Sequence, residues 1–311
     1  MKEPILQIPS TQITIRRLHL QEEFDAAYDV QAGLPEFRKV GLIPSYYMKL
    51  VNSRGGLVLG CFDGNRLVGY NYAFPCISSS LGIYLFADSM GFLKTYQKKH
   101  LGYCVKKLQY SLALSMGIRY IVWTYDPLKG VNANINIRKL GARILQYLPD
   151  QYTLSNTLDS RIEDTMQAAL PQDRFEVCWD IFSEEVKRRM ENPNTSEGDD
   201  VDQIPIMNST VWIQDTSNIN TNSLDYSEHF FQKIESIRWD YQSPNIRIEI
   251  PVSFIHLEEK VPSLAIDWRI KSRQIFQNYF NNSYQIEGFC HQKETKRNFY
   301  ILKKRSDRSL P

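Results

Sequence analysis

The feature that most constrains this chain is a polar turn that joins a strand-like segment to a long amphipathic helix. The segment Leu81–Leu93 is strand-like, and the turn Gln97–Gly102 (QKKHLG) opens a helix expected over Lys98–Met116. Ile118–Tyr125 (IRYIVWTY) follows as the most strand-like run of the chain. A strand, a helix and a strand in this succession form a βαβ unit, so the two strands are expected to be parallel.

The expected helix carries apolar residues at the spacing of one helical face, and a glycine stands where such a helix ends. These residues are Leu101, Cys104, Val105, Leu108 and Leu112, with Gly117 just beyond the last turn. The first turn of a helix presents unpaired N–H groups and the positive end of the helix dipole, which bind phosphate oxygens. Gly102 lets a pyrophosphate approach the backbone closely. The turn therefore predicts a binding site for a phosphorylated ligand.

Lysines surround this turn, at positions 98, 99, 106 and 107. They fit an ordinary exposed helix face, but their place beside the anion site favours attraction of phosphate. His100 is expected to be a solvated turn residue that narrows the phosphate site, rather than a direct ligand.

The remaining elements alternate along the chain. The expected strands are Ile13–Leu18, Gly56–Phe62, Leu67–Pro75, Phe175–Trp179, Ile246–Ile250, Tyr284–Phe289 and Asn298–Leu302. The expected helices are Leu20–Val30, Pro44–Asn52, Asn132–Leu140, Phe182–Met190 and Ser263–Phe280. An Asp63-Gly64 turn between two of the strands predicts a hairpin. Trp268, Phe276 and Tyr279 have helical spacing and are expected in the core.

A polar stretch, Glu191–Gln203, contains Val201 as its one large apolar residue and is read as a flexible linker. We therefore expect a catalytic domain over 1–182, a charged helix end and linker over 183–205, and a C-terminal α+β subdomain over 206–311. The length of 311 residues accommodates two such parts.

Charge and cysteine content exclude several classes of function. Lysine and arginine number 37 against 35 acidic residues, a net charge of +2, which argues against a nucleic-acid-binding surface. The five cysteines are scattered without metal-ligand spacing, so reduced thiols and no metal site are expected. No signal-peptide core and no run of roughly 20 apolar residues is present. The expectation is a cytoplasmic protein without a membrane span.

The turn also resembles the signature of the GNAT acyltransferase superfamily, Gln/Arg-x-x-Gly-x-Gly/Ala. Gln97 and Gly102 fit it, and His100 replaces the middle glycine. Trp123–Leu128 (WTYDPL), followed by Asn132-Ala133 and Lys139–Ala142 (KLGA), resembles a two-part subgroup of predicted GNAT acetyltransferases. The likeness continues at Asp173–Val177, Trp268-Arg269 and Gly288-Phe289, and so covers nearly the whole chain except the linker.

This resemblance implies an α/β GNAT fold with splayed parallel strands flanked by helices, and transfer of an acyl group from acyl-CoA to an amine. Gly91, Phe92 and Leu93 would pair with the pantetheine amides through their backbone. The donor site would be completed by Gln97, Lys98, Lys99, His100, Leu101, Gly102, Tyr103 and Asn132.

Two residues are catalytic candidates. Asp88 lies in an apolar strand, where burial would raise its pKa toward the range of a general base; pairing with a lysine is an equal alternative. Tyr125 is a candidate proton donor or substrate ligand, although most such tyrosines are packing residues. Many GNAT enzymes carry, where this chain has Ile137, a tyrosine that acts as the acid toward the leaving thiolate. Asp126, before Pro127, is expected to cap a turn rather than to act in catalysis.

The acceptor stays open: a small-molecule amine, or a lysine or ornithine side chain of a peptide. The aromatic residues of Tyr70–Phe74 and Tyr84–Phe92 would line a larger acyl pocket or form packed core. The alternative function is a non-catalytic acyl-CoA-binding or protein-interaction module on the same fold.

Overall fold

The computed structural model describes residues 4–9, 11–34, 41–97, 99–151, 170–192, 201–214, 230–292 and 294–305. The chain divides into two compact units, Met1–Trp123 with Cys178–Glu191, and Thr124–Val177 with Asn192–Pro311. Two strands, β6 (Tyr120–Tyr125) and β8 (Arg174–Asp180), have residues in both units. This division assigns residues 124–177 differently from the predicted domains, 1–182 and 206–311, whose independent folding stays a prediction.

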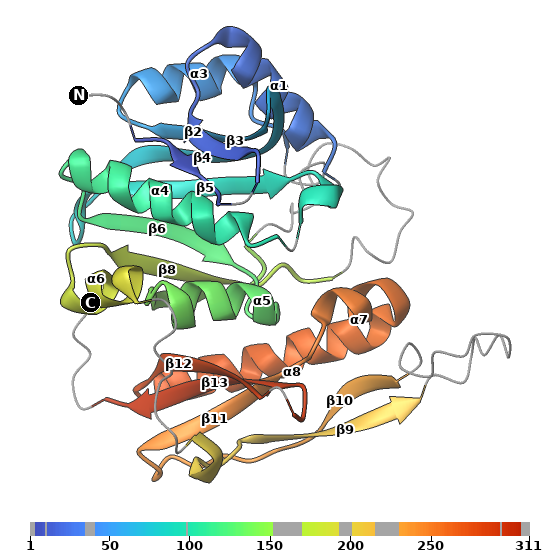
Figure 1. Cartoon of the computed structure of the whole chain (residues 1–311). Helices are drawn as coiled ribbons and strands as arrows, with labels where there is room; N and C mark the ends of the chain where they lie inside the picture. Colours follow the sequence, from blue (N-terminus) through green and yellow to red (C-terminus); the bar gives the residue numbers. More distant parts are fainter. Residues whose placement is uncertain are drawn as a thin grey trace, which may run out of the picture. The chain divides into compact units, whose positions relative to one another are not determined.

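The first unit is a mixed sheet with helices on both faces (Figure 1). Its other strands are β1 (Leu6–Gln7), β2 (Ile13–Arg17), β3 (Leu57–Asp63), β4 (Arg66–Ser78) and β5 (Gly82–Phe92). Its helices are α1 (Gln21–Ala32), α3 (Ser45–Ser53), a 3-10 turn (Lys94–Tyr96), α4 (Leu101–Ser115) and α6 (Glu184–Glu191). The strands follow the order β1-β2-β3-β4-β5-β6, with β8 next. Pairs from β1 to β5 are antiparallel, and β5 pairs with β6 in parallel, which confirms the βαβ prediction.

The predicted hairpin is present as β3 and β4. Asp63 pairs with Arg66 across the turn, and Gly64 has a φ of 57°, in the left-handed region that glycine enters without a Cβ penalty. The hairpin is thus confirmed, and its two-residue loop is Gly64-Asn65, between the paired residues Asp63 and Arg66.

Opposite faces of the sheet carry different helices, because successive residues of a strand point to opposite faces. Tyr70 and Tyr72 of β4 belong to the core formed with α1 and α3, which also contains Phe24 and Met48. Asn71, between them, points to α4 on the other face and bonds to Gln109 there. Part of the aromatic-rich region named above is thus packed core.

The predicted apolar stripe of α4 is confirmed. Leu101, Val105, Leu108 and Leu112 are buried, and Cys104 is half-buried. Gly117, with a φ of 70°, follows the C-terminus of the helix. In the first unit, the helix that follows the turn therefore packs against the sheet through an ordinary apolar face.

The second unit is an α+β structure. Its strands are β7 (Arg143–Leu148), which follows β8, then β9 (Asn208–Gln214), β10 (Phe230–Ile237), β11 (Asn245–Ile250), β12 (Tyr284–Gln292) and β13 (Arg297–Lys304). Its helices are α5 (Gly130–Ala133), a π-helical stretch (Asn134–Lys139), a 3-10 turn (Val201–Gln203), α7 (Phe254–Lys260) and α8 (Pro262–Asn281). Separate sheets form with the orders β11-β13-β12 and β10-β9. The predicted core residues Trp268, Phe276 and Tyr279 of α8 are fully buried.

Several predictions for the second unit need correction. The expected helix Asn132–Leu140 is one turn of α-helix followed by π-helix, and β7, β9, β10 and α7 were not predicted. Their sequences mix polar and apolar residues without a clean period, so the local pattern carried no signal. The predicted linker Glu191–Gln203 lies largely outside the described residues, although Val201–Gln203 forms the 3-10 turn.

Candidate functional site: a bulged strand and the N-terminus of α4

A β-bulge interrupts β5 at Asp88. Tyr72 of β4 pairs with Ser89, and the next residue, Ala73, pairs with Ala87. Asp88 is therefore an extra residue with no partner on β4. Bulges bend a strand and redirect its side chains, and they are frequent beside active sites.

Beyond the bulge, β5 and β6 no longer pair. Their parallel register covers Tyr84–Phe86 of β5 and Tyr120–Val122 of β6. In the described part of the chain no strand bonds to the other edge of β5 from Asp88 to Phe92, which we call the open edge. An extended ligand with amide groups can hydrogen-bond such an edge as another strand would.

The direction of the backbone groups along the open edge follows from one hydrogen bond. The N–H of Leu93 donates to the carbonyl of Val68 on β4 at 2.9 Å. In an antiparallel pair, residues alternate between facing the partner strand and facing away from it. Met90 and Phe92 therefore direct their N–H and C=O groups to the open edge. The carbonyl of Phe92 there accepts a hydrogen bond from Nε2 of Gln97 at 3.1 Å.

Of the three residues predicted to pair with pantetheine, Phe92 alone faces the open edge through its backbone. Leu93 already donates its N–H to β4, and Gly91 faces β4 by the same alternation. Met90 was not named from the sequence. The sequence indicates that backbone groups alternate between the two edges of a strand. It does not indicate which residues face which edge, because that depends on how the strand pairs in the folded protein.

Helix α4 begins at the end of this edge. Its N-cap residue, His100, has a φ of 60° and makes no side-chain cap hydrogen bond. Its carbonyl accepts from the N–H of Cys104 at 3.3 Å, so the amides of Leu101 and Gly102 precede the first bond of the helix. A Cβ atom on Gly102 would lie 3.4 Å from Cε of Met90, so the helix N-terminus lies directly beside β5.

The left-handed conformation of His100 explains why the family signature, which this turn resembles, has glycine there. Side chains other than glycine enter this region at a cost of roughly 1 kcal/mol. Tyr96 holds the preceding turn through a 2.6 Å hydrogen bond from its hydroxyl to Asp63.

The lysines near the turn differ in position. Lys99 is exposed, with Nζ 4.8 Å from the centre of the Tyr96 ring, and Lys107 is also exposed. Lys98 lies outside the described residues. Lys106 does not belong to the exposed group: it is buried, at 4% exposure, so its assignment to the mouth of the site was wrong.

The Asp88 side chain is exposed, yet the pKa of its carboxyl is raised. Its side chain reaches solvent, yet nearby protein atoms withdraw enough water to raise the pKa of the Asp88 carboxyl above its usual range. Desolvation, followed by the charge of Asp88, also raises the pKa of Tyr72. Among the described residues no lysine or arginine forms an ion pair with Asp88, and its roles as a base or as a structural carboxylate stay alternatives.

Tyr125 and Asn132 belong to the second unit. The Tyr125 hydroxyl is buried 3.1 Å from that of Tyr300, and desolvation raises its pKa above the usual range. Tyr300 in turn donates to the carbonyl of Pro127 at 2.9 Å. These contacts fit the packing alternative for Tyr125. Asn132 is half-buried in α5.

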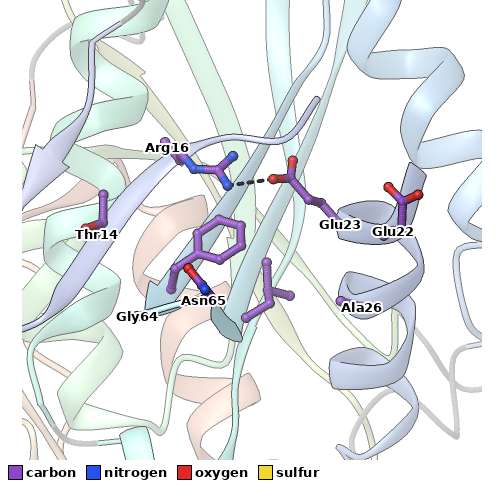
Figure 2. Close-up of a pocket in the computed structure, with 9 residues that line it drawn as sticks. Thr14, Arg16, Glu22, Glu23, Ala26, Gly64 and Asn65 are labelled. Atoms are coloured by element: carbon purple, nitrogen blue, oxygen red, sulfur yellow. Dashed lines mark hydrogen bonds and ion pairs between the residues drawn. The ribbon is translucent and has the colours of Figure 1, made fainter. Parts of the chain in front are cut away.

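A cavity of about 440 Å³ in the first unit lies apart from the residues of the candidate site (Figure 2). It is lined by α1, β2 and the β3–β4 hairpin, and the ion pair between Arg16 and Glu23, 2.5 Å long, crosses it. None of the predicted donor-site residues lines it.

The described residues lack two further features. They contain no group of three or more His, Cys, Asp or Glu side chains placed to hold a metal ion. They also contain no helix long and apolar enough to cross a membrane.

Comparison with known proteins finds solved acetyltransferase structures but no sequence relative. No family model and no curated protein sequence matches the chain. The NatC complex bound to Gag peptide and CoA matches at 11% identity and a TM-score of 0.42, over 55% of this chain and 99% of that one. The ribosomal-protein-S18-alanine N-acetyltransferase from Escherichia coli matches at 11% and 0.41, over 54% and 94%. YncA, a putative acetyltransferase from Salmonella typhimurium with acetyl-CoA, matches at 12% and 0.41, over 60% and 100%. Similarity of this size says what the chain resembles and assigns it no activity.

Proposed function

We propose that this chain is an acyl-CoA-dependent N-acyltransferase of the GNAT type. The observation that carries the proposal is the continuity of three features: the bulge at Asp88, the open edge of β5, and the uncapped N-terminus of α4. Each matches one part of an acyl-CoA molecule, namely the thioester, the pantetheine amides and the pyrophosphate.

The donor would be held mainly by backbone groups. The N–H of Phe92 would bond to a pantetheine amide, and the helix amides at Leu101 and Gly102 would receive the pyrophosphate together with the positive end of the α4 dipole. Lys99 would add a screened charge attraction from the surface. Nearer the bulge, the N–H of Met90 would donate to the thioester carbonyl oxygen and stabilise the charge that develops there.

In the reaction, the amine nitrogen forms a bond to the thioester carbon, the carbon–sulfur bond breaks, and CoA leaves with the electron pair as thiolate. The amine must also lose a proton. The Asp88 carboxylate can accept it, because its raised pKa brings it nearer to the working range of a general base. For the thiolate we assign no side-chain acid: position 137 is Ile, and the Tyr125 hydroxyl is bonded to Tyr300.

We propose two classes of acceptor, as from the sequence: a small-molecule amine, or a lysine or ornithine side chain of a peptide. The rival function is a non-catalytic module that binds acyl-CoA. Release of free thiol from acetyl-CoA, measured with a panel of amines of both classes, separates the two. Binding of CoA without amine-dependent thiol release would favour the module.

The donor site itself is tested by Gly102→Asp, with Gly102→Ala as the matched control. The 3.4 Å distance from a Cβ at this position to Met90 is an ordinary contact, so both variants should fold. The aspartate places negative charge against the pyrophosphate, and CoA affinity measured by calorimetry should fall about tenfold, or about 1.4 kcal/mol. The alanine variant should stay close to the parent. Equal affinity of the aspartate variant and the parent would place the donor elsewhere.

A further inference from the structure

Lys106 is a buried ammonium group on the face of α4 that packs against the sheet. Its Nζ atom lies 3.6 Å from the centre of the Trp123 ring and 3.0 Å from Oε1 of Gln109. In the described part of the chain no carboxylate forms an ion pair with it. Burial away from water lowers the pKa of Lys106 to about 7. The aromatic ring and one amide oxygen thus replace part of the hydration that the ammonium group loses on burial.

The contact with Gln109 begins a chain of hydrogen bonds that crosses to the sheet. Nε2 of Gln109 donates to Oδ1 of Asn71 at 3.1 Å, and Nδ2 of Asn71 donates to the backbone carbonyl of Ser89 at 3.1 Å. An ammonium group only donates, so Gln109 must turn its oxygen to Lys106 and its NH₂ to Asn71. The same constraint then orients Asn71. The charge at one end therefore fixes the direction of both amides.

The chain ends on the peptide unit that carries the N–H of Met90. The carbonyl of Ser89 and the N–H of Met90 belong to one planar peptide group and point in opposite directions. The carbonyl points to β4, where Asn71 reaches it, and the N–H points to the open edge. A hydrogen bond to a carbonyl polarises its peptide group and strengthens its N–H as a donor.

We propose that Lys106, Gln109 and Asn71 are positioning residues that polarise the Ser89–Met90 peptide, so that the Met90 N–H binds the thioester carbonyl oxygen more strongly. This inference rests on the proposed acyltransferase function. Below about pH 7, where Lys106 is protonated, it gives the site a positive charge that acts on the reacting carbonyl through the hydrogen-bond chain, without touching the substrate.

Stability gives no reason for such a lysine. A buried charge without an opposite charge destabilises a fold, and an apolar side chain of similar volume would fit beside Trp123 without that penalty. Departures of this kind from the rules of core packing are expected where function requires them.

The test is the infrared absorption of acetyl-CoA labelled at the carbonyl carbon and bound to the full chain. A hydrogen bond to the carbonyl oxygen lowers its stretching frequency, so the parent should absorb below the frequency of acetyl-CoA in solution. In Lys106→Met the band should return at least halfway to the solution value, while the affinity for acetyl-CoA stays within about twofold. Lys49→Met, which removes an exposed charge of α3 outside the proposed donor site, should match the parent.

A second variant separates the hydrogen-bond chain from the field of the charge. Gln109→Met leaves the ammonium over Trp123 but breaks the chain, and it should lose most of the frequency shift as well. Folding of each variant is checked by thermal unfolding. If both variants bind acetyl-CoA at the parent's frequency, the inference is overturned and the proposed function stands. If the parent itself does not bind acetyl-CoA, both are overturned.

Discussion

In the second unit Asp126 and Arg269 meet through two hydrogen bonds of 2.8 Å, whereas in the first unit the ammonium of Lys106 lies over a tryptophan ring. Both groups are almost fully buried. Burial alone would raise the pKa of Asp126, but the Arg269 guanidinium holds it well below the usual range. A paired charge keeps its ionisation, while Lys106, without a carboxylate among the described residues, moves toward neutrality.

The same contrast extends to other carboxylates. In the second unit Asp173 accepts from Arg273 and from the Tyr147 hydroxyl, and Glu249 accepts from Arg297 and Gln232. In the first unit Asp88, at the bulge, has no ion pair within the described residues. The second unit thus pairs these buried carboxylates with arginines, whereas the proposed function gives the charges of the candidate site a role toward a ligand. The predictions below test that difference.

The largest effect is expected from Arg269→Met. It leaves Asp126 buried without its partner, and removing one member of a buried pair typically costs about 3–5 kcal/mol of folding stability. Urea unfolding measures the loss. The double variant Asp126→Asn/Arg269→Met should recover a large part of it, because no unpaired charge remains. If the double variant is no more stable than the single one, the stability lost in Arg269→Met does not come from leaving Asp126 unpaired.

Asp88→Asn comes next, with an effect on turnover instead of stability. The amide cannot accept the proton of the amine, so thiol release with the best amine of the panel should fall about a hundredfold near pH 7. Thermal stability should not fall, since Asp88 forms no ion pair with the residues that the structure describes. A higher pH should partly rescue the variant, because more amine then arrives deprotonated. A large loss of stability with turnover near the parent's would instead make Asp88 structural.

Lys106→Met should raise stability, in contrast to Arg269→Met. The pKa of Lys106 is lowered from 10.5 to about 7 on folding, so the unfolded chain binds more protons between these values. The destabilisation by Lys106 is therefore complete below about pH 7 and diminishes as the pH rises toward 10.5. After allowing for the unpaired oxygen left on Gln109, the variant should gain about 2 kcal/mol at pH 6 and less at pH 9. Equal gains at both pH values would contradict the assigned shift.

The smallest effect is expected from His100→Gly. Glycine relieves the left-handed conformation but adds freedom to the unfolded chain, so the net gain should be about 0.5 kcal/mol in urea unfolding. CoA affinity should be retained. Ser283→Gly, at a φ of 66° in the second unit, is the matched control and should gain a similar amount. A loss at position 100 alone would show that the His100 side chain makes a stabilising contribution of its own.

Much of the framework of the candidate site was predictable because its signals are local. The stripe Leu101–Leu112 and the glycine at 117 depend on residues near in sequence, and the structure places both as expected, although α4 itself begins at Leu101. The bulge at Asp88 was not predictable, since it arises from the register with β4. The identity of Met90 as the residue facing the open edge depends on the same register.

The burial of Lys106 was also not predictable from the sequence. On α4 it adjoins the apolar stripe, and as a lysine it was placed at the surface. Its contacts are Trp123 on β6 and Gln109 on α4, and Gln109 in turn bonds to Asn71 on β4. The pairing of Asp126 with Arg269 spans 143 residues of sequence. No local pattern contains such a contact, because it exists only once the chain has folded.

The sequence by itself determined the βαβ unit, the hairpin at Asp63-Gly64 and the core face of α8, because periodicity and turn chemistry act between neighbouring residues. Only the tertiary structure decided where β5 bulges, which backbone amides face its open edge, and which charges are paired. Those outcomes depend on register and on burial, and both are set by segments distant in sequence.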